Sequence, residues 1–230
     1  MNTETTDNIQ LTITPLPFDS ELFGYPVGKA EITENWNENK FLEEANKFQL
    51  VYIFSAEPLS MISAEIKEIE TRIVFEKELT GNQDTDIGIK KFEGELNSDL
   101  ESLAFQSGAF SRFKTDLRLN SGEFEKLYKL WIQNSCRAGE VLIADNSAGF
   151  VSCNLKENLA QIGLIAVGKD QRSKGWGKKL IHAAEGFSFS KGATKMRIGT
   201  QEANQPACSL YSKLGYEVVE KVRVWHYWKK

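Results

Sequence analysis

Short runs of alternating hydrophobic and polar residues recur along this chain, and each run is the pattern of a strand that buries one face. Within the first 85 residues, strands are expected at 11–16, 27–32, 50–56 and 71–79, a helix at 38–48, and a turn-rich segment at 18–26. The acidic stretch 63–70 is expected to be a second helix. This part of the chain therefore mixes helices and strands.

After residue 86, apolar positions at helical spacing alternate with apolar runs of strand length. Strands are expected at 87–92, 141–145, 148–155, 160–167, 196–200 and 216–228, and helices at 98–106, 175–190 and 207–214. A further helix follows Asn120, which forms an N-terminal capping pair with Glu123. Its apolar stripe consists of Phe124, Leu127, Tyr128 and Trp131. This order predicts an α/β fold with helices on the faces of a mixed sheet.

A polar segment at 80–86 shows no periodicity and is the best domain boundary in the sequence. We expect a disordered tail at 1–10, a smaller N-terminal α/β domain at 11–85 that takes part in substrate binding, and a second domain at 86–230. The long last strand could pair with a second copy of the chain, so a homodimer is one alternative for the assembly.

The composition is that of an ordinary globular protein, with 41% hydrophobic and 26% charged residues. No apolar run approaches the ~20 residues that cross a bilayer, and the polar start resembles neither a signal nor a transit peptide. We therefore expect a cytoplasmic protein without a membrane partner. A net charge of −4 disfavours general nucleic-acid binding. Three widely spaced cysteines and two histidines predict neither a disulfide framework nor a metal site.

The stretch GKDQRSKGWGKK, residues 168–179, is locally basic in a chain that is acidic overall. It joins an apolar strand to a helix, so the amides of the first helical turn lack partners within the helix, and the helix dipole places about +0.5 charge there. Gly175 and Gly177 let the main chain approach a bulky anion. A phosphate is the expected ligand, although the GxxxxGK[ST] and GxGxxG nucleotide patterns are both absent. The alternative is a structural turn before a solvated basic helix end.

The spacing Arg172-x-x-Gly175-x-Gly177, between an apolar strand and an amphipathic helix, resembles the cofactor loop of the GCN5-related N-acetyltransferases, the GNAT superfamily. The resemblance implies an acetyl-CoA site and a mixed, mostly antiparallel sheet. It implies that the pantetheine arm lies beside Ile165, Ala166 and Val167. The pyrophosphate is implied to bind the loop residues Arg172, Ser173, Lys174, Gly175, Trp176, Gly177 and Lys178.

A second motif has the order and spacing found in that superfamily. Asn204, Ala207, Tyr211, Gly215 and Tyr216 match the pattern N-x-x-A-x-x-x-Y-x-x-x-G-[FY]. The resemblance implies that Tyr211 donates a proton to the departing thiolate and that Asn204 binds the cofactor. The residues themselves leave alternatives open, because Tyr211 could be a core tyrosine and Asn204 a helix N-cap.

A general base is less evident in the sequence. Many superfamily members have a Glu on the strand after the cofactor helix, where Gly199 stands here. Glu202 follows in the loop, and His182 is expected to be a packing or surface residue. A water molecule held by Thr200 or Gln201 would be sufficient for an acceptor amine of low pKa.

Further segments resemble the TDP-fucosamine acetyltransferase family, among them FDSELFGY at 18–25, the Ser111-Arg112-Phe113 motif and Thr200-Gln201. That resemblance implies acetylation of the 4-amino group of a nucleotide-linked 4-amino-4,6-dideoxy sugar. Arg112 would pair with the diphosphate, and Phe113 would stack on the base or the sugar. Thr200 and Gln201 complete the implied substrate site. A capping arginine and a core phenylalanine are the alternatives.

Two other functions stay open on the sequence alone. The chain could acetylate a protein N-terminus or another small-molecule amine, with Tyr216 or Tyr227 as a second tyrosine near the acceptor. It could also bind acyl-CoA without catalysis, although the glycine loop and Tyr211 together favour an enzyme.

Overall fold

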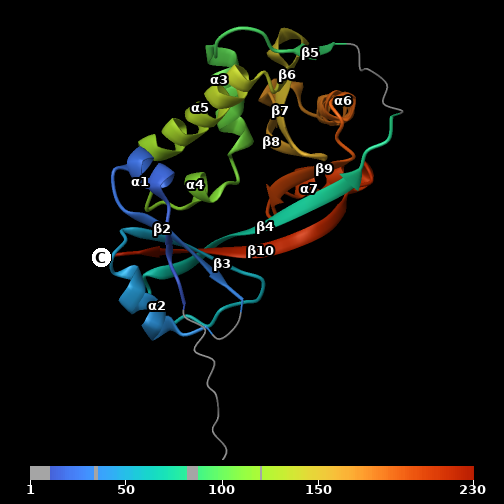
Figure 1. The fold of residues 1–230 in the computed structure, drawn as a ribbon. Helices are drawn as coiled ribbons and strands as arrows, with labels where there is room; N and C mark the ends of the chain where they lie inside the picture. The colour runs from blue at the N-terminus through green and yellow to red at the C-terminus, as the bar shows by residue number, and fades with distance from the viewer. Residues whose placement is uncertain (1–10, 34–35, 82–87, 120) are drawn as a thin grey trace, which may run out of the picture. The chain divides into compact units, whose positions relative to one another are not determined.

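The computed structural model describes residues 11–33, 36–81, 88–119 and 121–230 (Figure 1). The expected tail at 1–10, most of the expected boundary segment and Asn120 of the expected capping pair lie outside the described residues. The chain forms two compact units. The N-terminal unit comprises residues up to 70 together with 222–230, and the central unit comprises residues 71–221. That 11–85 and 86–230 are separate domains stays a prediction.

In the N-terminal unit, neighbouring strands follow the order β1-β2-β3-β10. Their bounds are Thr14–Pro15, Val27–Ile32, Leu50–Ser55 and Glu217–Trp228, and the helices of this unit are α1 (Pro17–Phe23) and α2 (Glu38–Ala45). β2 and β3 are parallel, whereas β10 pairs antiparallel with β3 over residues 223–228. Phe41, Ile53 and Trp225 are buried together, which gives this unit its own apolar core.

Helix α1 corrects the expectation of a turn-rich segment at 18–26. Pro17 stands in the first helical turn, and the chain leaves the helix through Gly24 in a left-handed conformation, with φ of 81°. The Ser20 hydroxyl also donates a hydrogen bond to the carbonyl of Leu16 (2.7 Å). A proline at the start and a glycine past the end are signals of a helix, which the turn-forming residues between them obscured.

The acidic stretch 63–70 is not helical either. Strand β4 (Ile66–Glu78) begins inside it and continues through the expected strand at 71–79. The β-branched residues Ile66, Ile69 and Ile73 favour a strand. Residues 72–78 of β4 also pair antiparallel with β9, a segment far away in the sequence. This non-local pairing outweighs the local acidic pattern.

The central unit follows the predicted order of helices and strands. After β4 it contains β5 (Ile89–Lys91), α3 (Ser98–Ser107), α4 (Arg112–Thr115), α5 (Ser121–Ala138), β6 (Val141–Ala144), β7 (Gly149–Lys156), β8 (Leu159–Val167), α6 (Trp176–Ser190), β9 (Lys195–Gln201), α7 (Gln205–Lys213) and the start of β10, with 3-10 turns at Asp145–Ser147 and Lys169–Gln171. The short helix α4 is an addition to the prediction.

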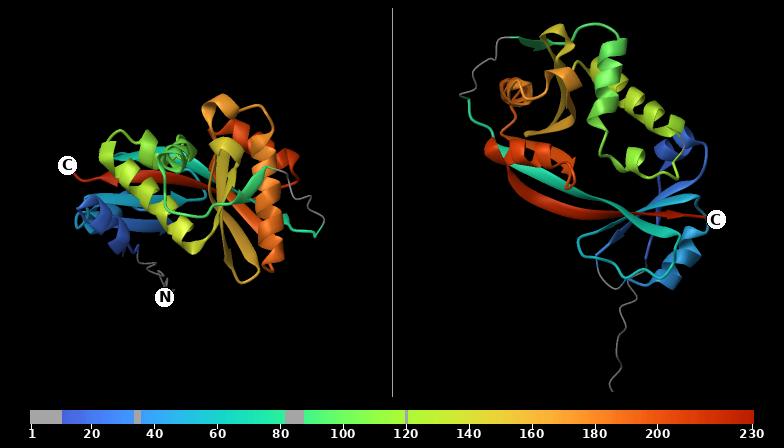
Figure 2. Two further views of the ribbon diagram at one scale, coloured as in Figure 1. Left: turned by 90° about the horizontal axis from the view of Figure 1, so that it is seen from above. Right: turned by 180° about the vertical axis from the view of Figure 1, so that it is seen from behind.

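The sheet of the central unit has the strand order β4-β9-β8-β7-β6-β5. β8 and β9 are parallel, and the other neighbours in this series are antiparallel. α6 lies on one side of β6–β8, and α3 and α5 lie on the other (Figures 1 and 2). The predicted α/β fold with a mixed, mostly antiparallel sheet between helices is therefore confirmed.

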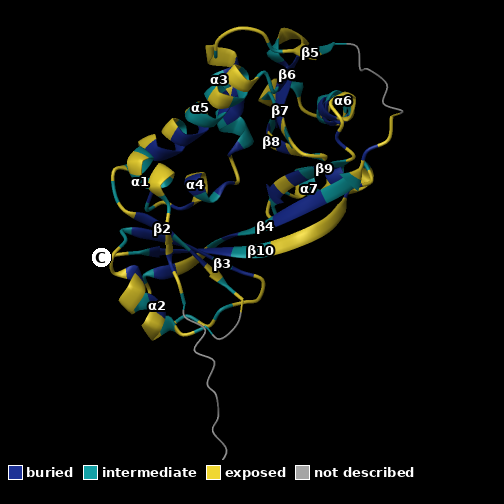
Figure 3. Cartoon of the chain, in the orientation of Figure 1, coloured by how far each residue is buried: buried dark blue, intermediate teal, exposed yellow. Residues whose placement is uncertain are grey.

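Burial within the central unit follows these layers (Figure 3). On the side of α6, the sheet residues Ile162, Met196 and Ile198 form one apolar cluster with Leu180 and Tyr211. The first part of β10, residues 217–221, is exposed by contrast. The apolar cluster under α6 therefore fixes the positions of β8, β9, α6 and α7, which form the candidate site.

Candidate functional site

The parallel strands β8 and β9 separate before either strand ends. Their ladder runs from Leu159 opposite Lys195 to Ile162 opposite Ile198, and the described residues show no further pair between these two strands. Beyond this point β8 continues beside β7, and β9 continues beside β4. The main-chain edges of 163–167 and 199–201 that would complete the ladder are therefore open among the described residues.

A β-bulge marks the point of separation. The register between β7 and β8 shifts next to Ser152, whose buried hydroxyl accepts a hydrogen bond from the amide of Leu164 (2.9 Å). Because of the shift, Ile162 before the bulge and Ile165 after it both pack into the cluster under α6. A regular strand would turn residues three apart to opposite faces. The bulge thus interrupts the pairing while both side chains stay on the apolar side.

The loop after β8 leaves a run of main-chain amides unpaired. Within the described part of the chain, no amide from Ser173 to Lys178 donates a hydrogen bond. Gly175 is the N-cap of α6 in a left-handed conformation (φ 84°), and no side chain caps the helix. Ser173 also has a positive φ, of 60°. Left-handed residues beside ordinary ones turn successive amides into a concave nest that favours anions, so the conformation of this loop suits an anionic ligand.

Basic side chains surround this nest. The loop and first helical turn carry Lys169, Arg172, Lys174, Lys178 and Lys179 against the single acid Asp170. The Nε of Arg172 donates a hydrogen bond to the carbonyl of Val167 (3.3 Å), which holds this side chain at the end of β8. The ammonium of Lys179 lies 5.1 Å from the ring centre of Trp176. The charge and the amides therefore favour the same ligand, a phosphate-like anion.

Helices α6 and α7 approach each other closely at Gly177. A Cβ at this position would lie 3.0 Å from the Cδ2 of Leu210. Leu210 immediately precedes Tyr211, so the absence of a side chain at Gly177 lets the start of the loop helix pack beside the helix that holds this tyrosine. Gly175 is therefore required for its left-handed conformation and Gly177 for the close packing of α6 against Leu210.

Tyr211 is buried in α7, with 3% of its surface exposed. Its ring packs edge-on against Phe75, with 5.5 Å between the ring centres, and lies 6.4 Å from the ring of Tyr216. Burial, and to a smaller extent the charge of Cys208, raises the pKa of the Tyr211 hydroxyl well above its ordinary value of 10.0. This phenol is therefore neutral at neutral pH and can donate a hydrogen bond.

Comparison with known families shows which proteins this part of the chain resembles. The Acetyltransferase (GNAT) family matches residues 106–216, which contain the separating strands, the anion loop and Tyr211. Over these residues, slightly less than half of the chain, the protein is similar to the GNAT acetyltransferases. The cofactor loop inferred from the sequence lies within this matched segment.

Two curated proteins align with parts of this chain. A streptothricin acetyltransferase from Escherichia coli is 39% identical over 59 residues, which cover 26% of the chain and 34% of the relative. A dTDP-fucosamine acetyltransferase from Escherichia coli O6:H1 is 31% identical over 138 residues, which cover 56% of the chain and 57% of the relative. The chain therefore spans about a third and somewhat more than half of the lengths of these relatives.

Among solved structures, an acetyltransferase assigned to the GNAT family from Novosphingobium aromaticivorans superposes with a TM-score of 0.54. The match covers 79% of this chain and 75% of the other, at 16% sequence identity. At this identity the comparison shows a shared fold, in agreement with the mixed sheet of the central unit.

Asn204 links the end of β9 to α7. Its Oδ1 accepts a hydrogen bond from the amide of Ala207 (3.4 Å), and its Nδ2 donates one to the hydroxyl of Thr200 (3.2 Å). Thr200 is itself buried. The N-cap alternative is thus what the structure shows for Asn204, and a contact with the cofactor stays a prediction.

The residues near the end of β9 that were considered for removal of the amine proton differ in their surroundings. Gly199 is exposed and Gln201 half-buried, and the carbonyl of Gln201 accepts a hydrogen bond from the amide of Asn204 (2.9 Å). The carboxylate of Glu202 pairs with the ammonium of Lys221 (2.7 Å). Gln201 therefore presents a polar side chain to the surface, whereas Glu202 is engaged by a cation.

Arg112 and Phe113 lie together in α4, whose N-cap is Ser111. Phe113 is 6% exposed and meets Trp131 edge-on, with 5.9 Å between the ring centres. The guanidinium carbon of Arg112 lies 4.3 Å from the centre of the Phe113 ring. The two predicted substrate residues therefore stack on each other in the helical layer, and their role toward a substrate stays a prediction.

The sequence analysis missed a buried charged network around Glu185 of α6. Its fully buried carboxylate accepts hydrogen bonds from the ammonium of Lys77 (2.9 Å) and the hydroxyl of Tyr216 (2.8 Å). Burial and the charge of Glu185 raise the pKa of the Tyr216 hydroxyl. The signal in the sequence was an acidic residue one turn after the apolar Ile181 of the expected helix. The network joins α6 to β4 and the start of β10, beside the ring of Tyr211.

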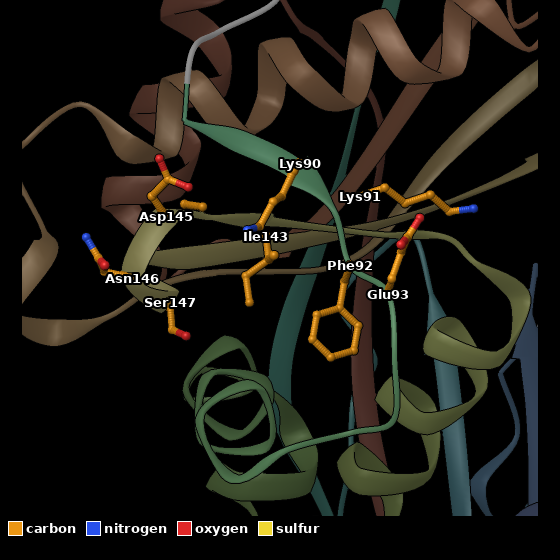
Figure 4. A pocket seen from close by; sticks show the side chains of 9 residues that line it. Lys90, Lys91, Phe92, Glu93, Ile143, Asp145, Asn146 and Ser147 are labelled. Atoms are coloured by element: carbon orange, nitrogen blue, oxygen red, sulfur yellow. The ribbon is translucent and has the colours of Figure 1, made fainter.

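Two hollows of the central unit lie away from Tyr211. One of about 430 Å³ lies between the Asp145–Ser147 turn and the segment 90–93 (Figure 4). Another of about 420 Å³ is lined by the segment around Cys153 and by the end of α6. Neither lining includes Tyr211 or the loop 172–178.

Among the described residues, no helix has the length and apolar character to span a membrane, and no group of acids, histidines and cysteines could hold a metal ion.

Proposed function

We propose that this chain is an acetyl-CoA-dependent N-acetyltransferase whose acceptor is the amino group of a nucleotide-linked 4-amino-4,6-dideoxy sugar. The observation that carries this proposal is the run of unpaired amides from Ser173 to Lys178, which directly follows the separation of β8 from β9. The match of residues 106–216 to the Acetyltransferase (GNAT) family supports acetyl transfer. The partial similarity to a dTDP-fucosamine acetyltransferase supports the acceptor class.

The residues of this site fit the cofactor part by part. The amide nest and Arg172 suit a pyrophosphate, because both favour a compact double negative charge. The open edge of β8 along Ile165, Ala166 and Val167 suits the amides of a pantetheine arm, which can bond to it as another strand would. Bound acetyl-CoA supplies the acetyl group as a thioester. In this proposal the arm runs along the separated strands toward Tyr211.

Tyr211 is the proposed proton donor. Its raised pKa keeps the phenol protonated, so it offers a hydrogen bond to the thioester sulfur as negative charge develops there. Ordinary pKa values near 10 for a phenol and 8.5 for a thiol make complete transfer of this proton unfavourable by ~2 kcal/mol, and burial increases that cost. Tyr211 therefore acts mainly while the sulfur carries partial charge.

The acceptor amine must lose a proton as the new amide forms. Gly199 provides no side chain for this purpose, and Glu202 is engaged by Lys221. We propose that a water molecule held by Gln201 carries the proton away, because the hydroxyl of Thr200, the other residue expected to hold this water, is buried and accepts a hydrogen bond from Asn204. This route requires an amine that is partly uncharged at neutral pH, as an amine flanked by ring hydroxyl groups is.

A thiol-release assay with acetyl-CoA tests the proposal. The acceptors are TDP- and UDP-linked 4-amino sugars, the same nucleotide sugars with a hydroxyl in place of the amine, and a peptide with a free N-terminus. Release that depends on the sugar amine is expected, and the hydroxyl sugars serve as matched controls. Absence of release with every amine, or absence of CoA binding by calorimetry, would refute the proposed activity.

A second candidate is acetylation of another small-molecule amine. The 39% identical stretch shared with a streptothricin acetyltransferase favours it, since that relative bears a small-molecule name. Higher kcat/KM for a non-nucleotide amine in the same panel would select this candidate and reject the nucleotide sugar. A protein N-terminus or a non-catalytic role receives no comparable support from these comparisons.

A further inference from the structure

We propose that Arg72 recognises a negative charge on the acceptor, so that the preferred amine carries a phosphate or carboxylate group near the reacting nitrogen. The inference rests on the proposed acetyltransferase function and assigns its acceptor specificity to a residue outside the sequence motifs. It starts from the strand register, which brings Arg72 of β4 opposite Gln201 at the end of β9.

The guanidinium of Arg72 lies at the open end of the separating strands. A Cβ at Gly199 would be 3.5 Å from both the Nε and the Nη2 of Arg72, so the charged group rests over this glycine. Gly199 follows Ile198, the last residue of β9 that pairs with β8. The positive charge therefore occupies the space above β9 that a larger side chain at position 199 would fill.

Only one face of β9 is open at this point. Ile198 and Thr200 point into the buried cluster on the side of α6 and α7. Gly199 is exposed, and Gln201 and Arg72 are half-buried on the opposite face. An amine that reaches a thioester between β8 and β9 from solvent must approach on the face of Arg72.

The charge of Arg72 is available to a ligand. Its neighbours along this face form ion pairs, namely Glu76 with Arg197 (2.6 Å) and Lys195 with both Glu76 (3.2 Å) and Glu78 (2.9 Å). Within the described ranges of the chain, Arg72 has no carboxylate within 4.0 Å. A half-buried arginine without a partner beside the reaction site is well suited to bind an anion.

Two physical effects follow from this placement. The planar guanidinium can bind a phosphate or carboxylate through two parallel hydrogen bonds. A fixed cation also disfavours the charged form of a nearby amine, which lowers the amine's pKa and supplies the uncharged nucleophile that acetyl transfer needs. Arg72 thus selects an anionic acceptor and discriminates against a polycationic one.

The test compares Arg72→Gln and Arg72→Lys with a matched control, Arg137→Gln, which alters an exposed arginine of α5. Each variant is assayed with two acceptor pairs, a dTDP-linked amino sugar with its neutral methyl glycoside, and an amino acid with its amide. Arg72→Gln is expected to raise KM for the anionic member at least about tenfold and to change the neutral member less than about twofold. Arg72→Lys retains part of the preference, and Arg137→Gln retains all of it.

The pair that responds distinguishes a phosphate from a carboxylate. Equal effects of Arg72→Gln on anionic and neutral acceptors, or no effect on either, would overturn the inference. Calorimetric titration of dTDP into CoA-saturated protein adds a readout independent of turnover, with about tenfold weaker binding expected for Arg72→Gln. Unaltered dTDP binding also overturns the inference. Failure of the wild type to bind CoA would instead remove the proposed function, and dTDP titrated into the CoA-free wild type and Arg72→Gln would then decide whether Arg72 binds an anion.

Discussion

At the scale of single residues, burial determines the chemistry of Tyr211. An exposed tyrosine would ionise near pH 10, whereas this one is 3% exposed and holds its proton to higher pH. The same burial that keeps Tyr211 a donor makes the phenolate costly. Loss of activity at alkaline pH should therefore come from groups other than Tyr211 until well above pH 10.

The change Tyr211→Phe removes the hydroxyl and keeps the ring that packs against Phe75. We expect kcat to fall roughly 100-fold, the scale of a lost general acid, while the dissociation constant of CoA changes little. Thiol release and calorimetry measure the two quantities. Tyr128→Phe, which removes a hydroxyl from another buried tyrosine in α5, is the control. Equal turnover of Tyr211→Phe and wild type would exclude the proton-donor role.

Glu76 gives a pH dependence of stability with a definite sign. Hydrogen bonds from Arg197 and Lys195 lower the pKa of its carboxyl below the ordinary value of 4.5, against the opposing effect of desolvation. Its contribution to the free energy of unfolding is therefore present above about pH 4.5 and is lost as the pH falls through the lowered pKa.

Glu76→Gln should accordingly reduce the free energy of unfolding at pH 7 and have a smaller effect at pH 3, as measured by urea denaturation. Glu78→Gln is the matched control, because Glu78 is 69% exposed and its single ion pair with Lys195 contributes little. A Glu76→Gln effect of the same size at both pH values would contradict this assignment.

At the scale of secondary-structure elements, α6 is bounded by two left-handed glycines. Gly175 precedes it with φ of 84°, and Gly192 follows it with φ of 95°; a Cβ at either position would meet no atom within 4 Å. A side chain at either glycine costs conformational strain without a clash. The two positions differ only in that Gly175 adjoins the unpaired amides.

Gly175→Ala and Gly192→Ala should therefore lower the free energy of unfolding by a similar amount, about 1 kcal/mol each. Only Gly175→Ala is expected to weaken CoA binding, by about tenfold or more, because the amide nest depends on the left-handed residue. Chemical denaturation and calorimetry separate the two effects. Equal CoA affinity of both variants would argue against a nest at Gly175.

The elements that sequence periodicity predicted well are those with strong local signals. The strands β6, β7 and β8 and the helices α3 and α6 begin and end within a few residues of the expected positions, and α5 begins where the capping pattern placed it. The failures were α1 and the start of β4. In α1 the turn-forming residues competed with the Pro17 and Gly24 signals, and β4 is stabilised by strands far away in the sequence.

The same distinction holds for the site. The loop glycines and the Asn204–Tyr211 spacing are local motifs, so they were visible in the sequence. Ser152 at the bulge, Glu185 beside Tyr216 and Arg72 over Gly199 acquire their roles from the pairing of separate strands and helices. No local pattern encodes such a pairing, and these three residues were accordingly found only in the structure.

At the scale of the whole molecule, strand β10 brings residues from the end of the sequence into the N-terminal unit. Residues 222–230 belong to the N-terminal unit, where residues 223–228 of β10 pair with β3 and where Trp225 is buried with its indole NH bonded to the hydroxyl of Ser55 (3.2 Å). The fold of the N-terminal unit therefore depends on a segment that lies far from it in the sequence.

A chain that ends at residue 221 should lose this pairing and expose the apolar core of the N-terminal unit. We expect amide hydrogens of β2 and β3 to exchange rapidly in this truncated chain, whereas those of β6–β8 keep their protection. Hydrogen exchange followed by mass spectrometry measures both. Val218→Ser, a change at a 55% exposed position of the same strand, is the control. Protected β3 amides after truncation would show that the N-terminal unit is stable without β10.

The β-bulge at Ser152 and Leu164 has a consequence for how the protein could gain or lose its ligand. A sheet that continued in regular register would pair all of its main-chain NH and CO groups with one another and become more stable. It would then have no unpaired main-chain group at this edge to bind a ligand. The one extra residue of β8 at the bulge prevents this regular pairing with β7. Deleting one residue of β8 at 163 or 164 is therefore expected to restore the regular register with β7 and to remove the edge proposed to bind the cofactor.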